Sequence, residues 1–183
     1  YRLQSGQVAA DLDSETIDSV EFGVRGQQGA FAYDLSAYWM AKENVIFQDR
    51  DRYNVSGADT LHRGIDVTFS WALSDIWSLR GNGAYARHRY DSDIELIGSR
   101  NTIEGNDVDT SPKHFGSLQL LADLAPLGQA INAELEWLWV AKYWLDPNNR
   151  HEYAGHELLN LRGAWQITPR VTLTLVATNL LDE

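Results

Sequence analysis

Apolar and polar residues alternate along most of this chain, and the alternation divides it into eight segments. Within most of each segment, apolar residues or Gly occupy every second position and polar or charged residues lie between them, although Leu121 breaks the pattern in the fifth segment. A period of two is typical of β-strands, because successive side chains point to opposite faces of a sheet. The pattern therefore predicts strands over residues 19–26, 30–43, 62–72, 76–90, 113–124, 131–144, 157–167 and 170–179.

The connections between these strands alternate between short and long. The short ones are tight turns at residues 26–29, 73–75, 125–129 and 168–170. The long ones are polar loops over residues 44–61, 91–112 and 145–156. Transmembrane β-barrels have short periplasmic turns and longer extracellular loops. We therefore expect an all-β, antiparallel sheet that forms a segment of a transmembrane β-barrel, with its turns toward the periplasm and its loops outside.

The lengths of the strands and the positions of the aromatic residues support a membrane wall. Several predicted strands exceed the five or six residues usual in soluble proteins, and a tilted strand needs about 9–11 residues to cross a membrane. One aromatic group lies next to the tight turns: Phe31, Trp71, Trp77 and Trp165. Another lies toward the long loops: Trp39, Tyr85, Trp139 and Tyr143. Two such bands with an aliphatic waist are typical of a lipid-facing surface.

Composition narrows the functional classes. The chain has 183 residues, a formal net charge of −11 and no Cys. Disulfide bonds and thiolate metal sites are therefore excluded, and the acidic balance disfavours a nucleic-acid partner. Residues 1–18 are polar and acidic and show no signal peptide, which an outer-membrane protein needs. We therefore expect a mature piece or a fragment of a longer protein.

Four short motifs occur in order along the chain. They are Leu12-Asp13-Ser14-Glu15 followed by Glu21-Phe22-Gly23, then Arg63-Gly64-Ile65-Asp66, Ser111-Pro112-Lys113-His114 and Asn179-Leu180-Leu181-Asp182. They resemble, in the same order, the L-x-P-E…E-x-G, R-G-x-E, P-x-H and N-L-x-D motifs of TonB-dependent outer-membrane receptors. Ser14 stands where Pro is usual, and Asp66 where Glu is usual. The resemblance spans nearly the whole chain and places it in the C-terminal part of the receptor barrel.

The resemblance implies a fold and a function. Receptors of this family have a barrel of about 22 strands around a plug domain, and they import scarce nutrients, typically ferric siderophores. Residues 1–183 would then be a partial barrel domain of about eight meandering strands, without the plug or the final strand. The expected location is the outer membrane of a Gram-negative bacterium. The expected partners are outer-membrane lipid, an iron-complex ligand, and the TonB complex through a plug and a short N-terminal box that this sequence lacks.

This topology predicts three residues that contact a ligand. His88, Arg89 and Tyr90 lie at the loop end of their strand, where family members bind ligands in the upper lumen and loops. We predict no catalytic residues, cofactor or metal site. The acidic loop over residues 91–112 lacks the ligand spacing of a calcium loop.

Other chemical patterns have competing interpretations. Glu134 and Glu136 share a face about 6.5–7 Å apart. They could be a glycosidase pair, which needs about 5–5.5 Å in retaining enzymes, or a hydrated lumen wall; we favour the wall. The histidines of His151-Glu152…His156-Glu157 are too far apart for a zinc-protease motif, and Gly81-Asn82-Gly83 lies within a strand rather than before a helix. Two alternative functions stay open: a small self-closed outer-membrane barrel, and a soluble β-sandwich that binds or hydrolyses glycans.

Overall fold

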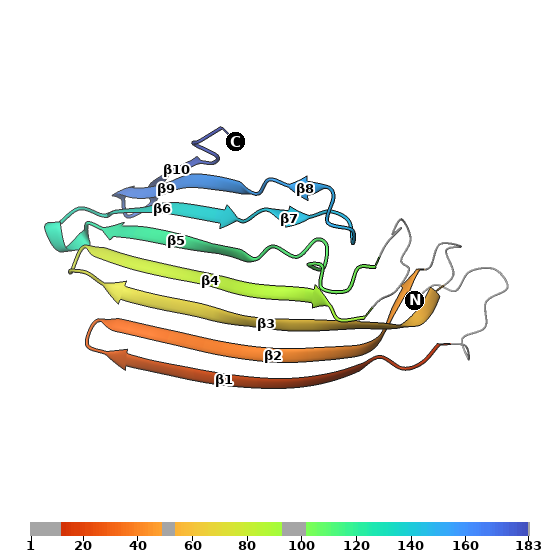
Figure 1. Ribbon diagram of the computed structural model, residues 1–183. Coiled ribbons are helices and arrows are strands. Elements are labelled where there is room, and N and C mark those ends of the chain that lie inside the picture. The colour runs from red at the N-terminus through yellow and green to blue at the C-terminus, as the bar shows by residue number, and fades with distance from the viewer. Residues whose placement is uncertain (1–11, 49–53, 93–101, 183) are drawn as a thin grey trace.

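The computed structural model describes residues 12–48, 54–92 and 102–182, and these form one curved antiparallel sheet with strands in chain order (Figure 1). The eight strands of the sheet are β1 (Thr16–Gln28), β2 (Phe31–Gln48), β3 (Asn54–Ala72), β4 (Trp77–Tyr90), β5 (His114–Asp123), β6 (Ile131–Val140), β9 (His156–Thr168) and β10 (Val171–Ala177). A separate two-stranded hairpin pairs β7 (Tyr143–Trp144) with β8 (Glu152–Tyr153).

All eight predicted strands are present and every neighbouring pair is antiparallel, which confirms the predicted sheet. The tight turns are gathered at one end of the sheet and the longer connections at the other (Figure 1). A single 3-10 turn over Ala125–Leu127 closes the β5–β6 connection. No helix in the described part of the chain is long and apolar enough to cross a membrane.

The predicted loop over residues 44–61 is wrong over most of its length. Residues 44–48 belong to β2 and residues 54–61 to β3; residues 49–53 lie outside the described part of the chain. The β2–β3 register shifts after Lys42 and again after Val45, and Asn44 has a φ of 56°. These irregularities break the period of two, so the alternation ended before the strands did.

The predicted strand over residues 131–144 ends earlier than expected, at Val140. Gly155, with a φ of 86°, brings the chain back so closely that an added Cβ would collide with the Val140 carbonyl oxygen. The next residues turn into the β7–β8 hairpin, in which Tyr143 lies opposite Tyr153. The predicted loop over residues 145–156 therefore contains β8.

Of the predicted loop over residues 91–112, residues 93–101 lie outside the described part of the chain.

The register places apolar residues of neighbouring strands side by side on one face. Pairs along this face are Phe31–Trp71, Leu35–Val67, Ile65–Tyr85, Leu79–Leu120, Leu118–Trp137, Leu135–Leu161 and Trp165–Leu173. More than half of these side chains are exposed, among them Ile65 at 51% and Leu173 at 57%. A soluble protein rarely leaves so large an apolar surface open.

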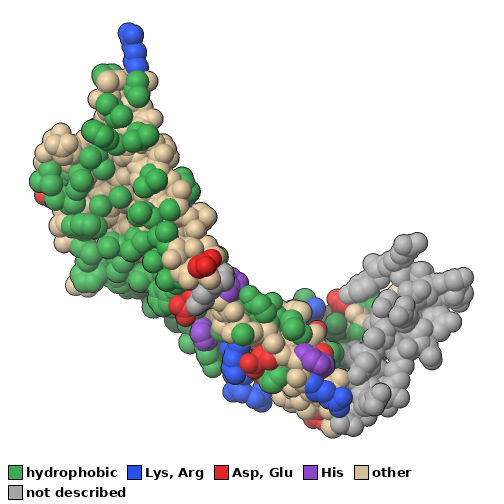
Figure 2. Space-filling view, turned by 90° about the horizontal axis from the view of Figure 1, so that it is seen from above, with side chains coloured by type: hydrophobic (Ala, Val, Ile, Leu, Met, Phe, Trp, Pro, Cys, Tyr) green, Lys and Arg blue, Asp and Glu red, His purple; other side chains and the backbone are tan. Residues whose placement is uncertain are grey.

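Figure 2 shows hydrophobic side chains gathered over the left part of the view. Most of the visible charged and histidine side chains lie away from that area, in the lower middle of the view. Apart from the two-stranded β7–β8 hairpin, the described residues form no second sheet that could cover the apolar face as in a sandwich. Within them β1 and β10 also pair on one side only, whereas a self-closed eight-stranded barrel requires them to pair with each other.

Two aromatic bands bound the apolar face. Trp39 lies eight positions after Phe31, and Tyr85 lies eight positions after Trp77. This spacing corresponds to roughly 26 Å along a strand and roughly 20 Å of height at barrel tilt, close to the lipid-facing band of a barrel. We call the residues between the two bands the spanning part. Because β3 has 19 residues and β4 has 14, their loop-side ends project beyond it.

Candidate functional site: the polar face and the loop end

A row of hydrogen-bonded side chains crosses three strands on the polar face. Gln119 on β5, Glu136 on β6 and Asn160 on β9 lie directly opposite one another in the register. Gln119 Nε2 donates to Glu136 Oε1 at 3.0 Å, and Asn160 Nδ2 donates to Glu136 Oε2 at 3.1 Å. Glu136 and Asn160 are both buried, although they lie on an open sheet face. The row therefore fixes these side chains as a rigid polar wall.

One arginine holds the two glutamates that could have formed a catalytic pair. Arg162 Nη1 lies 2.5 Å from Glu134 Oε1, and Arg162 Nη2 lies 2.9 Å from Glu136 Oε2. A retaining glycosidase needs one protonated carboxyl group that donates to the leaving oxygen. A guanidinium bound to both carboxylates stabilises their charged forms instead. This geometry favours the lumen-wall interpretation of Glu134 and Glu136.

The structure separates the three predicted ligand residues. His88 points to the polar face, where its Nδ1 lies 2.7 Å from Nδ1 of His62 on β3. Arg89, on the opposite face, has its Nε 4.0 Å from Asp107 Oδ1, and Lys113 Nζ lies 2.8 Å from Asp107 Oδ2. Only His88 therefore faces the polar surface with a partly exposed side chain. Ligand contact by these residues stays a prediction.

Tyr90 has a structural role at the end of β4. Its side chain is 8% exposed and packs with Ile103, which is fully buried, and with Phe47 and Val108. Its hydroxyl donates to Asp109 Oδ1 at 2.7 Å. Burial first, and then the hydrogen bond and charge of Asp109, raise the pKa of the Tyr90 hydroxyl, which lies beyond the spanning part. Tyr90 thus anchors the loop that follows β4 to the end of the sheet.

Comparison with known proteins identifies the family. The model of the family described as "TonB dependent receptor-like, beta-barrel" matches residues 2–180. The chain belongs to the TonB-dependent receptor family. No match is found among curated proteins. The family consists of transport receptors of the Gram-negative outer membrane, and membership confirms the resemblance drawn from the four sequence motifs.

Solved structures of TonB-dependent receptors share the fold at low sequence identity. The ferric yersiniabactin uptake receptor FyuA from Yersinia pestis is 19% identical, with a TM-score of 0.78 over 92% of this chain and 25% of that chain. The siderophore receptor PiuA from Acinetobacter baumannii is 15% identical, with a TM-score of 0.77 over 94% and 25%. The copper transporter OprC is 19% identical, with a TM-score of 0.71 over 92% and 26%. The chain thus spans about a quarter of the length of these receptors.

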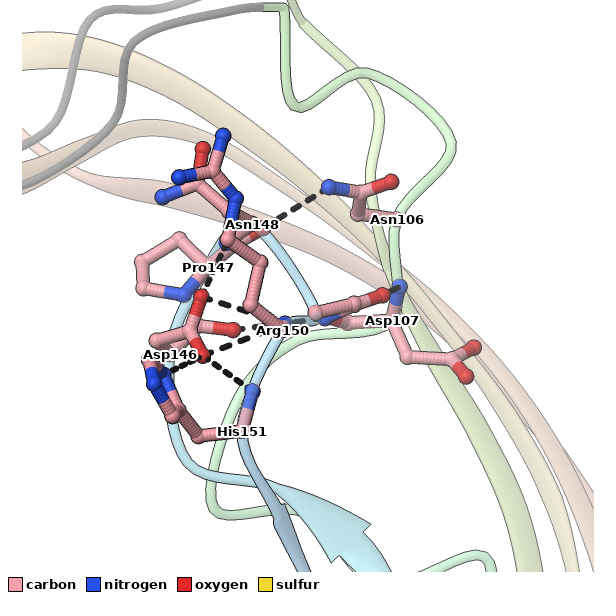
Figure 3. Close-up of polar contacts among 8 residues, drawn as sticks. Asn106, Asp107, Asp146, Pro147, Asn148, Arg150 and His151 are labelled. Carbon is pink, nitrogen blue, oxygen red and sulfur yellow. Dashed lines mark hydrogen bonds and ion pairs between the residues drawn. The ribbon is translucent and has the colours of Figure 1, made fainter.

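Two loops of this TonB-dependent receptor chain are tied together at the loop end (Figure 3). Asn106 Nδ2 donates to the Pro147 carbonyl oxygen at 2.8 Å. Asn149 bonds Asp107 twice, accepting from its backbone N–H and donating to its carbonyl oxygen, each at 2.9 Å. These bonds join the loop after β4 to the turn between β7 and β8.

Asp146 organises the second of these loops. Its carboxylate accepts bonds from the backbone N–H groups of Asn148, Arg150 and His151, and from the His151 ring at 3.0 Å. Desolvation raises the pKa of Asp146, but the bonds from His151, Arg150 and Asn148 outweigh it, so the net pKa lies below its ordinary value. His156 bonds Tyr153 instead, so the two histidines of the His-Glu repeat do not meet.

The sequence pattern missed the His62–His88 pair because these residues are 26 positions apart. Each histidine occupies an ordinary polar-face position of an alternating strand, and neither lies in a motif. Only the β3–β4 register shows that they are direct neighbours. The signal available in the sequence was the hairpin itself: a turn at residues 73–75 with matched strands predicts which residues face one another.

Proposed function

We propose that this chain forms part of the wall of an outer-membrane receptor that imports a scarce nutrient with energy from the TonB complex. The proposed substrate is a ferric siderophore or another iron complex. The observation that carries the proposal is a single sheet with an uncovered apolar face on one side and the Gln119–Glu136–Asn160 row on the other, in a chain of the TonB-dependent receptor family.

The two faces suit different surroundings. The apolar face between the aromatic bands has a height close to that of the lipid-facing band of a barrel, which supports contact with lipid. The polar row satisfies its own hydrogen bonds and presents a hydrated surface, as expected of a lumen wall. In this arrangement the tight turns face the periplasm, and the loops joined by Asn106 and Asn149 face outside.

Two solved relatives support an iron complex as the substrate. One is a ferric yersiniabactin uptake receptor, and the other is a siderophore receptor. OprC is a copper transporter with the same fold, so the fold alone does not select the metal. The substrate therefore needs a direct transport measurement.

The test is uptake by the complete receptor in a host that lacks its own siderophore receptors. Radioactive iron would be supplied as a panel of ferric siderophores and as ferric citrate, with a copper complex in parallel. We expect accumulation of at least one iron complex, and loss of that accumulation when the host's TonB is deleted. Accumulation of copper alone, or iron uptake that persists without TonB, would contradict the proposal. Heat-modifiable gel mobility of the receptor in outer-membrane fractions controls for folding.

A further inference from the structure

The His62–His88 pair lies on the polar face, beyond the spanning part on the loop side. His88 is three residues past Tyr85, which belongs to the loop-side aromatic band. The two Nδ1 atoms are 2.7 Å apart, and the ring centroids are 4.9 Å apart with the planes tilted by 53°. Two nitrogens bound at about 2.1 Å to one ion at right angles are separated by about 3 Å. This contact is a hydrogen bond in which one Nδ1 donates to the other, and a metal ion that replaced the shared proton would need the two nitrogens to separate by only about 0.3 Å.

A neighbouring hydroxyl group can accept the ring proton in the tautomer of His62 that binds metal. Thr60 Oγ1 lies 2.8 Å from Nε2 of His62, and Thr60 is 7% exposed. When Nε2 donates its proton to this oxygen, Nδ1 keeps a lone pair directed at His88. Metal-binding histidines commonly donate their other ring N–H to such a partner, which fixes the ring and the tautomer.

The charge state of the pair is also suitable. Imidazole binds metal in its neutral form. Burial, followed by the charges of His88 and Lys42, lowers the pKa of His62 to about 4, and burial lowers the pKa of His88. Both rings are therefore neutral near pH 7. Lys42 faces the pair from β2, and its positive charge repels a bound metal ion. This repulsion weakens binding, but Lys42 does not take the place of either histidine ligand.

We propose that His62 and His88 form a two-imidazole site for a late first-row divalent metal ion, with Cu²⁺ bound most tightly. In the described part of the chain, the two histidines have no third His, Cys, Asp or Glu close enough to complete a protein cage. Water or a donor group of an incoming molecule completes the coordination sphere from the lumen. Imidazole suits copper, nickel and zinc, and affinity in such sites peaks at Cu²⁺. The site does not depend on the transport proposal.

The test titrates the complete receptor in detergent with Cu²⁺ alone, in a buffer that does not bind copper and without a histidine tag. Affinity would come from competition with a chelator, and ligand type from nitrogen splitting in the electron paramagnetic resonance spectrum. We expect His62→Gln and His88→Gln each to lose one equivalent of bound Cu²⁺ and its two-nitrogen signal. The control is His114→Gln, because exposed His114 lies opposite Tyr85 on the outward face. Equal stoichiometry and splitting in the wild type and both pair variants would overturn the proposal.

Further variants test the surroundings of the pair and remain informative if the histidine variants fold poorly. Thr60→Val should weaken Cu²⁺ binding ~10-fold, whereas Thr60→Ser keeps the hydroxyl and the affinity. Lys42→Gln should tighten binding ~3-fold by removing the opposing charge. Equal affinity in Thr60→Val and Thr60→Ser would count against the site.

Discussion

At the scale of single residues, the loop end owes its order to side chains that bond backbone groups. Asp146 accepts hydrogen bonds from three backbone N–H groups of its own loop. Asn149, in the same loop, bonds to Asp107 in the loop that follows β4. Sequence inspection predicted a polar loop there but not this connection, because the partners come from loops about 40 residues apart. Of the predicted ligand residues, only His88 faces the polar surface, since strand alternation turns Arg89 away and a small core takes up Tyr90.

Acidification should release the Asp146 loop. The folded-state pKa of Asp146 lies below its ordinary value of 3.8, so its contribution is present above that value and is lost as pH falls through the lowered folded pKa. We expect hydrogen-exchange protection of residues 148–151, corrected for intrinsic rates, to be constant from pH 7 to pH 5 and to fall below pH 3.8.

Asp146→Asn should lower this protection ~5-fold at neutral pH, because the charged acceptor is lost. The variant should also lose the acid transition. Residues 60–68 of β3 serve as the internal control, since their protection should not respond to either change. A transition of equal size in the variant would show that another group controls the loop.

At the scale of elements, alternation predicted every strand of the eight-stranded sheet but misplaced the ends of some of them. It failed where the backbone leaves the period of two: at the irregular pairing beyond Lys42, and where Gly155 brings the chain back against Val140. Both features depend on contacts between strands, which a single segment does not reveal. The turns were easier to predict because Gly and Pro specify them locally.

The β4–β5 contact depends on a glycine without space for a side chain. An added Cβ at Gly116 would lie 2.5 Å from the Asn82 carbonyl oxygen and 2.5 Å from the Trp139 ring. Gly116→Ala should therefore force the two strands apart and destabilise the receptor by about 1–3 kcal/mol, measured by urea unfolding in lipid vesicles.

Gly163→Ala is the matched control for this substitution. Gly163 also lies within a strand, but the nearest atom to its added Cβ is the Asn132 carbonyl oxygen at 3.6 Å, an ordinary contact. Its unfolding free energy should change by less than about 0.5 kcal/mol. Equal destabilisation by both substitutions would mean that strand glycines matter through flexibility rather than through packing.

At the scale of the whole molecule, the direction of the two faces is the inference that alternation alone could not decide. The aromatic bands and the uncovered apolar face together point that face toward lipid. Neighbouring residues of β3 allow a direct test, because Val67 lies on the apolar face opposite Leu35, and Thr68 lies on the polar face opposite Asp34.

Val67→Arg should destabilise the receptor in lipid vesicles by about 2–4 kcal/mol, since it places a charge in the middle of the lipid-facing band. Thr68→Arg, one residue further along, should cost less than about 1 kcal/mol because its side chain enters water. Unfolding in urea, followed by Trp fluorescence, measures both. A larger loss for Thr68→Arg would place the polar face, rather than the apolar one, against lipid.

The chain-order arrangement of the sheet also bears on how such a wall assembles. Each strand joins a neighbour from the next part of the chain, so native contacts form between nearby segments rather than across the whole length. The entropic cost of closing a loop grows with the logarithm of the loop length. Here that cost arises in small steps, one for each hairpin that forms. The largest single step is the joining of β4 to β5 across residues 91–113. Pairing between strands that follow one another in the chain lets a large β-structure grow by strand addition, with each completed hairpin serving as the template for the next.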